Sequence, residues 1–503
     1  MRPITLIQIL LLSAACSAQP GFSVVHVGAA NASGEGRSIF ETSYGYLVFS
    51  AEVDQSSGLI WLYTTRFDPA GNHLGGYTFR SPRNLSTGLA DCVSRSVTGN
   101  FHATVGSFSS DMQDTLCIYQ FDDQGDTIAT AFVQAEASQG CRDCLSINAT
   151  ENWACGWCTT NTDPLIDVAC IRKIDIQGNE IIRRTWPNIQ RFSTITQVED
   201  ESFLVGGIRS SITDKTVLMK VSAEGEEIWT RYLGGINLLG GGSGHSTLMA
   251  NGNYLIAGCY LPPDSTEAGE RSFASLYCYS PDGEQLWRRD LLYGRYGGAV
   301  LSRAATNDEY WVVGGYYQVP RDPDLAATIW RVDMNGDTLY SRKYWYYGGE
   351  GAVNAATYGI DTTSDGGLVL TGVASEGMNG QEPFNHKTWI LKLDQHGCLV
   401  PGCHTVGLQV YELALQGALQ VSPNPTHDIV RFTLELPNGY PLQGHVQALV
   451  LDAQGKEVAR QNISASGTLV SGAIPLNGQA AGLYYLHFRD EEKWLAGQKV
   501  VVQ

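Results

Sequence analysis

The sequence predicts an all-β protein whose larger part is a repeat, and three observations support this prediction. Short runs of β-branched and aromatic residues recur along the chain, bounded by Gly, Asn and Asp. The composition, with 56 glycines and 17% charged residues, is typical of turn-rich β structure rather than of helices. A four-residue turn that begins with Asp or Ser also recurs at a period of about fifty residues, ending at Gly71, Gly125, Gly178, Gly225, Gly283, Gly336 and Gly397.

Each repeat contains four predicted strands. One strand precedes the turn, as in Thr216–Lys220, and another follows it, as in Glu227–Arg231. Asp or Ser at the first turn position can bond backbone N–H groups, and Gly at the fourth accepts a positive φ. Two further strands come before these in each repeat. The first is exemplified by Val300–Arg303, and the second by Tyr254–Gly258, which ends in Gly. Four antiparallel strands per repeat predict a seven-bladed β-propeller.

The two ends of the repeat region are predicted to meet. The last repeat reaches Gly397 but has no strand after its turn. Phe22–Gly28 has the character of a fourth strand with no turn before it. We expect residues 22–28 to pair beside residues 388–393, because this closes the ring and leaves no sheet edge exposed.

The N-terminus predicts export. Residues 1–18 have a positive start, an apolar stretch from Ile4 to Leu12 and a small-residue cleavage site ending at Ala18, which indicates a signal peptide. A lipoprotein signal using Cys16 is the alternative, but Ser13 stands where a bulky aliphatic residue is expected. No other apolar run is long enough to predict a membrane span. The net charge of -18 makes nucleic acid an improbable partner, because most of the surface would repel phosphates.

The predicted organisation is a signal peptide at 1–18, the propeller at 19–403, a connector at 404–417 and a second domain at 418–503. Alternating strands in the last segment predict a small β-sandwich that folds apart from the propeller. Four local motifs mark it: a Pro-Asn-Pro box, an Asp-x-x-Gly-Lys turn, a Gly-Leu-Tyr-Tyr-Leu strand and a Lys-Val-Val-Val terminus. The residues that define these motifs are Pro423, Asn424, Pro425, Asp452, Gly455, Gly482, Tyr484 and Lys499.

Together and in this order, these motifs resemble the type A C-terminal sorting domain of type IX secretion substrates. The resemblance covers about the last 85 residues. It implies export through the inner membrane, passage across the outer membrane of a Gram-negative bacterium by the type IX machinery, and a secreted or surface-anchored product. An accessory β-domain of another kind is the alternative. The repeat region resembles the propeller cargo often joined to such tails. This second resemblance implies a fold but no activity.

The links between second and third strands, and between repeats, are long and are predicted to share one face of the ring. Binding residues usually lie on loops held by a rigid scaffold, so we expect the site on this long-link face. Aromatic residues there could stack on sugar rings or on a protein, although they are also common structural parts of blades. The candidate binding residues are Tyr232, His245, Tyr293, Arg295, Tyr296, Asp322, Trp345, Tyr346, Tyr347 and Glu350.

The cysteines predict disulfides in an oxidising compartment. A hairpin centred at Ala149-Thr150 would place Cys141 opposite Cys158 and Cys144 opposite Cys155. The alternative is a zinc site made of these four thiolates. We further expect pairs Cys259–Cys278 and Cys398–Cys403; the connectivity of Cys92, Cys117 and Cys170 stays open, and one thiol should be left over.

Three functions are compatible with the sequence. The favoured one is a surface or secreted propeller that binds a protein or glycan. The second is a hydrolase or lyase acting on polysaccharide, with carboxylates such as Glu350, Asp322 or Glu376. The weakest is a quinone-dependent dehydrogenase, because such proteins usually have eight blades and a vicinal Cys-Cys pair. No Gly-x-Ser-x-Gly elbow, His-Glu-x-x-His helix or phosphate loop occurs, so the sequence assigns neither a reaction nor a cofactor.

Overall fold

The computed structural model describes the chain from residue 21 onward, apart from gaps that fall mostly between strands. All regular elements within this described part are β-strands. The signal peptide prediction lies outside it. The undescribed residues are 1–20, 27–31, 55–59, 80–83, 86–92, 109–114, 134–138, 160–166, 199–200, 209–215, 234–245, 261–271, 304–308, 318–326, 347–353, 376–385, 400–410, 414–418, 437–444, 453–455, 465–467 and 491–492.

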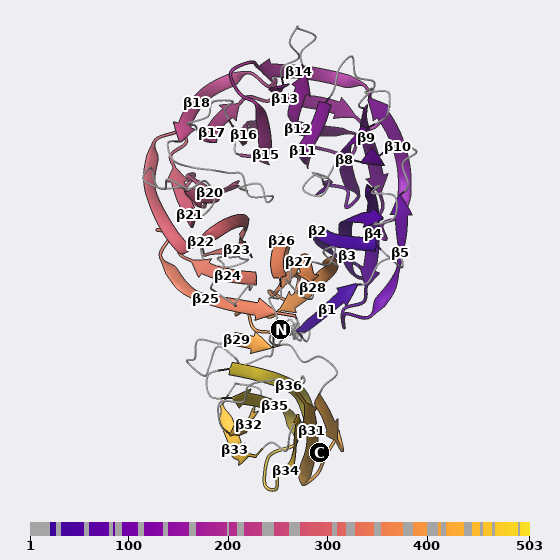
Figure 1. Ribbon diagram of the computed structural model, residues 1–503, viewed down its shortest axis with the longest axis vertical. Coiled ribbons are helices and arrows are strands. Elements are labelled where there is room, and N and C mark those ends of the chain that lie inside the picture. Colours follow the sequence, from indigo (N-terminus) through magenta and orange to yellow (C-terminus); the bar gives the residue numbers. More distant parts are fainter. Residues whose placement is uncertain are drawn as a thin grey trace, which may run out of the picture.

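The described strands up to residue 393 form antiparallel sheets arranged around a ring (Figure 1). The first sheet contains β2 (Ala32–Thr42), β3 (Gly45–Asp54), β4 (Ile60–Phe67) and β5 (His73–Phe79), and the second β6 (Asn84–Leu85), β7 (Val93–Arg95), β8 (Phe101–Phe108), β9 (Thr115–Phe121) and β10 (Thr127–Val133). The third contains β11 (Gln139–Ser146), β12 (Glu151–Thr159), β13 (Asp167–Asp175) and β14 (Glu180–Trp186), and the fourth β15 (Arg191–Gln197), β16 (Phe203–Ile208), β17 (Thr216–Val221) and β18 (Glu227–Leu233).

The next strands continue the same pattern, with one long strand shared between two sheets. They are β19 (Ser246–Leu248), β20 (Tyr254–Tyr260), β21 (Ser272–Tyr279), β22 (Gln285–Arg303), β23 (Tyr310–Tyr317), β24 (Ala327–Val332) and β25 (Thr338–Trp345). The sequence predicted separate strands at the two ends of β22. Instead its first part pairs with β21 up to Gly294, and its second part pairs with β23 from Arg295.

The last sheet of the ring contains β26 (Asn354–Thr362), β27 (Leu368–Ser375), β28 (His386–Leu393) and β1 (Phe22–His26). β1 pairs antiparallel with β28, from Phe22 opposite Lys392 to His26 opposite Thr388. Trp389 Nε1 also donates a hydrogen bond to Ser23 Oγ at 2.9 Å. The N-terminal strand therefore lies where the sequence placed it, beside the final strand of the last repeat.

The turns have the chemistry that the sequence predicts. Asp68 Oδ1 accepts hydrogen bonds from the backbone N–H groups of Ala70 and Asn72 at 2.9 and 2.8 Å, and Gly71 has a φ of +86°. The carboxylate therefore holds the turn, while the glycine supplies a backbone conformation that other residues rarely adopt.

The turn glycines also pack one sheet against the next. A Cβ added at Gly283 would lie 2.9 Å from the ring of Trp229 on the outer strand of the preceding sheet, and one at Gly336 would lie 2.5 Å from Trp287. Arg231 Nε donates to the Gly283 carbonyl at 2.8 Å, so an arginine holds the same turn. Each of these turns therefore needs glycine for close approach as well as for φ.

Apolar contacts between neighbouring sheets build the core. Leu47 and Phe49 of the first sheet meet Phe101 and Phe121 of the second, and the rings of Phe49 and Phe121 lie 5.3 Å apart. Between the last and first sheets, Phe22 and Ile390 pack in the same way against a cluster that includes Tyr46. The core is thus a series of clusters around the ring, which makes the ring a rigid support for residues at its two edges.

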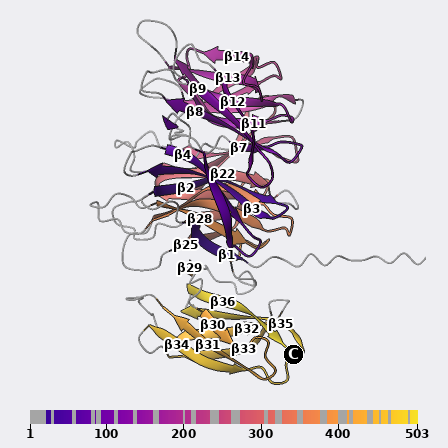
Figure 2. The ribbon, with the colours of Figure 1, turned by 90° about the vertical axis from the view of Figure 1, so that its right-hand side faces the viewer.

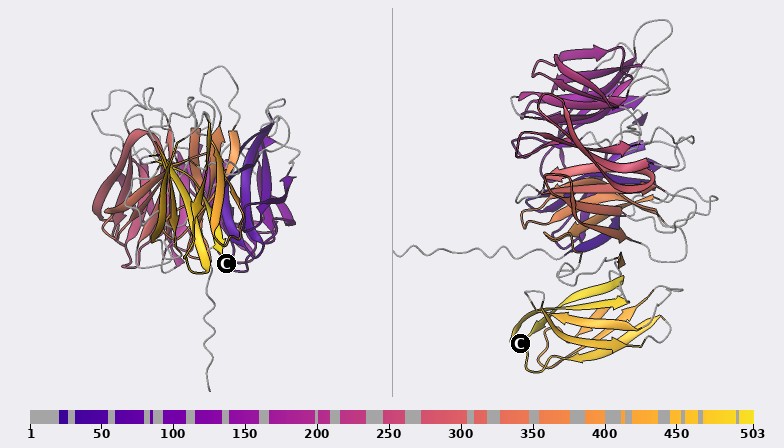
Figure 3. Two further views of the ribbon diagram at one scale, coloured as in Figure 1. Left: turned by 90° about the horizontal axis from the view of Figure 1, so that it is seen from below. Right: turned by 90° about the vertical axis from the view of Figure 1, so that its left-hand side faces the viewer.

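The C-terminal residues form two further groups of strands beyond the edge of the ring, one of which is joined to the ring through β29 (Tyr411–Leu413) (Figures 2 and 3). One sheet contains β30 (Leu419–Ser422), β31 (Ile429–Glu435) and β34 (Leu469–Pro475), and the other β32 (Val446–Leu451), β33 (Glu457–Ile463), β35 (Gly482–Asp490) and β36 (Lys493–Val502). They enclose their own core, including Phe432, Val450 and Phe488. Within the predicted connector, β29 (Tyr411–Leu413) pairs in parallel with β25 and β36.

Candidate functional site

Only some of the sequence-predicted binding residues lie in the described part of the structure. Tyr232 is exposed near the end of β18, and Tyr346 packs against the core between the last two sheets of the ring. Tyr293, Arg295 and Tyr296 are in β22 and Trp345 is in β25. The remaining candidates lie outside the described residues: His245, Asp322, Tyr347, Glu350 and Glu376. A shared site on the long-link face stays a prediction.

A polar cluster lies where the first and last sheets meet. Glu35 Oε1 lies 2.8 Å from His386 Nδ1, and Arg37 donates to Glu35 Oε2 at 2.6 Å. The Arg37 guanidinium lies 4.4 Å from the ring centroid of Tyr358, and Ser33 Oγ accepts the His386 N–H. β2 and β28 both begin at the long-link edge, so this cluster lies close to that edge.

The charges of this cluster stabilise an ionised carboxylate. Burial alone would raise the pKa of Glu35, but hydrogen bonds and charges from His386 and Arg37 outweigh it and lower the pKa to about 2. Sequence reasoning missed this group because Glu35 and His386 are 351 residues apart and meet only through ring closure. No local motif marks either residue.

A second carboxyl group nearby behaves in the opposite way. Burial raises the pKa of Glu52 to about 7, and its Oε1 has no hydrogen-bond partner among the described residues. A Cβ added at Gly34 would lie 3.5 Å from Glu52 Cγ and 3.1 Å from Thr388 Oγ1, so Glu52 lies against the last sheet. Two carboxyl groups with divergent pKa values can serve acid–base chemistry. Glu52 is only 1% exposed, however, and so does not reach a bound molecule.

A pocket opens at the opposite edge of the ring, between the turn after β2 and the turn after β9. Its volume is about 190 Å³. Tyr44 and Leu74 flank it with about half of their surface exposed. Arg66 NH1 donates to Gln124 Oε1 at 3.4 Å, and Asp123 Oδ2 accepts a 2.6 Å hydrogen bond from Ser43. The lining residues are Thr42, Tyr44, Tyr46, Arg66, Phe67, Leu74, Asp123 and Gln124.

The chemistry of this pocket suits a small polar ring. An aromatic flank offers a stacking surface, while a carboxylate, an amide and a guanidinium can bond neighbouring hydroxyl groups. Its volume is below the roughly 300 Å³ at which pockets for drug-sized ligands begin. One sugar unit is therefore the scale of ligand that it admits. The only signal in the sequence is an aromatic residue, Tyr44, inside a tight turn.

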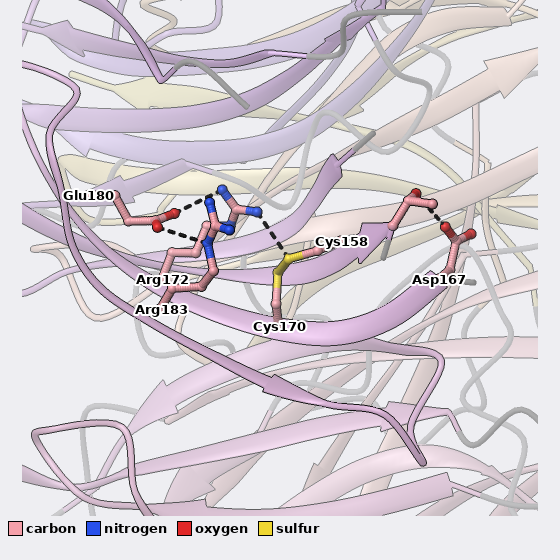
Figure 4. The surroundings of a disulfide bond; sticks show 7 residues. Cys158, Asp167, Cys170, Arg172, Glu180 and Arg183 are labelled. Carbon is pink, nitrogen blue, oxygen red and sulfur yellow. Dashed lines mark hydrogen bonds and ion pairs between the residues drawn. A yellow bond between two sulfur atoms is a disulfide. The ribbon is translucent and has the colours of Figure 1, made fainter. Parts of the chain in front are cut away.

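The disulfide of the third sheet joins Cys158 to Cys170, with Cα atoms 6.1 Å apart (Figure 4). The predicted pairs Cys141–Cys158 and Cys144–Cys155 are therefore wrong. Cys141 lies opposite Gly156, and Cys144 lies opposite Ala154, because the register shifts between Cys141 and Asp143. Cys141, Cys144 and Cys155 are buried thiols.

The turn explains why the predicted register fails. Asn148 Oδ1 accepts the N–H groups of Thr150 and Glu151 at 2.8 and 2.9 Å, and the pairing of Ser146 with Asn152 centres the hairpin on Ala149 rather than between Ala149 and Thr150. With the shifted register, Cys155 packs with Trp153 toward the fourth sheet, whereas Cys144 packs toward the second. A zinc site of all four thiolates would require Cys158, whose sulfur is bonded to Cys170.

The other predicted disulfides have different outcomes. The pair Cys259–Cys278 is wrong, because Cys259 lies opposite Ala274 and Cys278 lies opposite Leu255. Cys278 is a buried thiol, with its sulfur 3.7 Å from Met249 Sδ. Cys398 is disulfide-bonded, whereas Cys403 lies outside the described residues.

Two motifs of the C-terminal domain meet in space. Asn424 Nδ2 donates to the Lys499 carbonyl at 2.7 Å, and the Val501 N–H donates to Asn424 Oδ1 at 2.9 Å. The Pro-Asn-Pro box, of which Pro423 and Pro425 are the flanks, is thus bound to the terminal strand. Tyr484 OH donates to the Ala480 carbonyl at 2.8 Å. Asp452 accepts the Lys456 N–H, while Gly455 lies outside the described residues.

Comparison with known families agrees with these motifs. Residues 420–503 match the secretion system C-terminal sorting domain. These residues form a type IX sorting domain. This C-terminal domain indicates a substrate of type IX secretion and implies a secreted or cell-surface protein. Within the part of the chain that the structure describes, no helix is long and apolar enough to cross a membrane.

The ring has distant structural likenesses. A protein of unknown function from Dyadobacter fermentans is 7% identical with a TM-score of 0.44, and 74% of this chain and 97% of that one are covered. The β-propeller domain of the Trilobed protease from Pyrococcus furiosus is 10% identical with a TM-score of 0.33, covering 71% and 90%. The Neurospora crassa Pan2 WD40 domain is 11% identical with a TM-score of 0.38, covering 71% and 89%. No curated protein matches the chain. These likenesses concern the fold alone, which the strand pairing itself defines.

Proposed function

We propose that this chain is an exported binding propeller, which the type IX machinery delivers outside the cell to engage an extracellular glycan or protein. The pocket beside Tyr44 is the observation that carries this proposal, because a small concavity with an aromatic flank and convergent polar groups suits a sugar unit. A polysaccharide-acting enzyme is the alternative, and the carboxylates first suggested for it lie outside the described residues.

The long-link edge is the second candidate binding surface. Links such as 261–271 and 376–385 join second to third strands there, whereas the turn after β2 spans only Ser43 and Tyr44. Tyr232 lies near this edge and is 51% exposed. A protein ligand would suit this edge better than the pocket, because protein interfaces are broad and rich in aromatic residues.

Affinity electrophoresis against a panel of soluble bacterial and plant polysaccharides tests the binding proposal. The protein should be retarded by at least one polysaccharide, and Tyr44→Ala and Asp123→Ala should each weaken that retardation by about tenfold. Tyr232→Ala tests the long-link edge instead, and Phe132→Ala is the matched control, since Phe132 of β10 is a half-exposed aromatic residue that does not line the pocket. If no polysaccharide retards the protein, or if only Tyr232→Ala weakens binding, the pocket is not the binding site. Release of reducing sugar would instead support the enzyme alternative.

The export step has its own test. Deleting residues 418–503 should leave the propeller in the periplasm, because the sorting domain has its own core and is the part that the secretion machinery recognises. Protease accessibility of whole cells distinguishes the outcomes. A truncated propeller that still reaches the cell surface would contradict the sorting role.

A further inference from the structure

Several inner strands of the ring contain one extra residue at a shift in register. The inserted residues are Arg37 in β2, Arg142 in β11, Ser193 in β15 and Tyr358 in β26. These strands lie on the inner side of the ring (Figure 1). A bulge of this kind re-aims a side chain and is common beside binding sites. The insertions therefore set side chains apart from the regular strand pattern around the centre, and arginine is inserted in the first and third sheets.

The two inserted arginines differ in their partners. Arg37 donates to Glu35 Oε2 at 2.6 Å, and its guanidinium lies 4.4 Å from the ring centroid of Tyr358. Arg142 has an aromatic partner of the same kind, because its guanidinium lies 5.2 Å from the ring centroid of Trp157. Within the described part of the chain, however, no carboxylate forms an ion pair with Arg142. The arginine of the first sheet is thus neutralised by the protein, and the arginine of the third sheet is not.

A further arginine, Arg191, lies close to Arg142. Arg191 begins β15 of the fourth sheet, and Asp143 Oδ2 accepts the Ile195 N–H of that strand at 2.8 Å, which holds β15 against β11. Burial, and then the charge of Arg142, lowers the pKa of Arg191, so the two cations interact. The Nε atoms of both arginines are buried, and among the described residues neither has a hydrogen-bond acceptor.

Two neighbouring cations without an anion are an unfavourable arrangement. Both side chains are partly buried, so water screens their repulsion incompletely. The chain has a net charge of -18, so carboxylates are abundant, yet none in the described ranges forms an ion pair with either arginine. An oxyanion beside the two guanidinium groups would offset the repulsion. Each guanidinium presents a planar set of N–H donors that matches the oxygens of such a group.

From this arrangement we propose that Arg142 and Arg191 bind an oxyanion group, a carboxylate, sulfate or phosphate, at the junction of the third and fourth sheets. Both residues lie near the starts of inner strands, and therefore near the long-link edge. The indole of Trp157 lies beside Arg142 and offers a flat surface on which a sugar ring can stack. A sugar acid or a sulfated sugar would use all three residues, whereas a free inorganic anion would use the arginines alone. This site is separate from the pocket beside Tyr44, which opens at the opposite edge.

Isothermal titration calorimetry of the whole protein tests the proposal, with sodium sulfate and a trimer of galacturonic acid as probes in chloride buffer of constant ionic strength. At least one probe should bind with a Kd of about 1 mM or lower, as two charge-assisted contacts predict. Binding of the trimer at least about tenfold more tightly than sulfate would identify a sugar acid as the ligand, and any smaller difference a free anion. If neither probe binds the wild-type protein at concentrations up to about 10 mM, the proposal is overturned.

Single substitutions assign the binding to this junction. Arg142→Gln and Arg191→Gln should each weaken the binding of the anion by about tenfold, because each removes one charge-assisted contact. Arg289→Gln is the matched control. The Arg289 guanidinium also lies over a tryptophan, Trp287, but it already bonds Asp337 at 3.1 Å, so its loss should leave the affinity unchanged. Equal affinities in all three variants, or an equal loss in all three, would contradict the site.

Thermal unfolding distinguishes a binding role from a structural role. In buffer without sulfate or phosphate, Arg191→Gln should have a Tm no lower than the wild type, because it removes one of two neighbouring cations that lack an anion. Millimolar sulfate should raise the Tm of the wild type but not that of the variant. A Tm lowered equally with and without sulfate would show that Arg191 serves the fold alone. If a glutamine variant does not fold, the lysine variant at the same position, which keeps the charge but loses the planar fork, should still weaken binding.

Discussion

The junction between the last and first sheets differs from the junction between the fourth and fifth. At the fourth–fifth junction an apolar cluster, including Leu204 and Tyr254, is closed at one edge by Arg231 and Trp229, which bond backbone carbonyls of the next turn. At the last–first junction, Glu41 of β2 accepts hydrogen bonds from Ser364 of the last sheet. Polar side chains therefore make many of the contacts where the ring closes.

Buried titratable groups gather at the closing junction. The ring of His26 on β1 stacks on Tyr63 of the first sheet at 5.4 Å and lies 4.8 Å from His73. Within the last sheet, and close to Tyr46 of the first, Lys392 of β28 is fully buried and bonds both oxygens of Asp365 in the turn between β26 and β27, at 3.1 and 3.0 Å. Hydrogen bonds are directional, and a buried charge requires a partner, so we infer that these groups specify which sheet closes the ring where no covalent link fixes the partner. The cost is a junction whose stability depends on protonation.

The largest expected effect comes from breaking the buried ion pair. Lys392→Met should reduce the free energy of unfolding by about 3–5 kcal/mol, because it leaves the Asp365 carboxylate buried without its cation. Arg231→Met, at the fourth–fifth junction, should cost only about 1 kcal/mol, since it removes hydrogen bonds from a partly exposed side chain. Urea unfolding of both variants measures the difference. Equal losses would show that the buried ion pair beside the closing junction stabilises the ring no more than the partly exposed contacts of the fourth–fifth junction.

Local chemistry explains which parts of this fold the sequence predicts. The Asp–Gly turns and the strand at Phe22 follow from short-range preferences, and the structure contains both. The disulfide register depended on one hydrogen-bonding side chain, Asn148, and on a bulge near Arg142, neither of which cysteine spacing reveals. The sequence also predicts two separate strands where the structure has the single strand β22. The two parts of β22 pair with different neighbouring strands, β21 and β23.

The polar groups at the closing junction were beyond prediction for a different reason. Glu35 and His386 come from opposite ends of the ring, and Glu52 becomes unusual only when the last sheet covers it. The pocket beside Tyr44 also forms between two repeats, so no single repeat contains its pattern. Sites of this kind are formed by contacts between neighbouring repeats. The sequence pattern of a repeat predicts only how that repeat folds.

The pH dependence of stability separates two groups at the closing junction. Burial, and to a lesser degree the charge of His73, lowers the pKa of His26 from 6.5 to about 4. As the pH falls, the unfolded chain therefore takes up this proton at a higher pH than the folded chain does. The junction loses stability as the pH falls from 6.5 to 4. Burial raises the pKa of Glu52 from 4.5 to about 7. Here the folded chain takes up the proton at a higher pH than the unfolded chain does. The free energy of unfolding therefore rises as the pH falls from 7 to 4.5.

Single substitutions isolate these opposing contributions. Glu52→Gln should raise the free energy of unfolding by about 2 kcal/mol at pH 8, where the wild-type carboxylate is charged and buried, and change it little at pH 4.5. His26→Gln should flatten the acid loss between pH 6.5 and 4. Thermal unfolding across pH 4–8 measures both. A Glu52→Gln variant with the same stability increment at both pH values would refute the assignment to charge burial.

The smallest expected difference concerns the turn glycines. Gly283 has a φ of +80° and an added Cβ would lie 2.9 Å from the Trp229 ring, whereas Gly252 has a φ of +82° and open space around it. Both alanine variants carry the backbone strain, at about 1 kcal/mol each. Gly283→Ala should cost about 1 kcal/mol more, because the outer strand of the fourth sheet must also move away. Equal losses in urea unfolding would mean that these glycines serve the turn alone, and that the junction does not depend on their close approach.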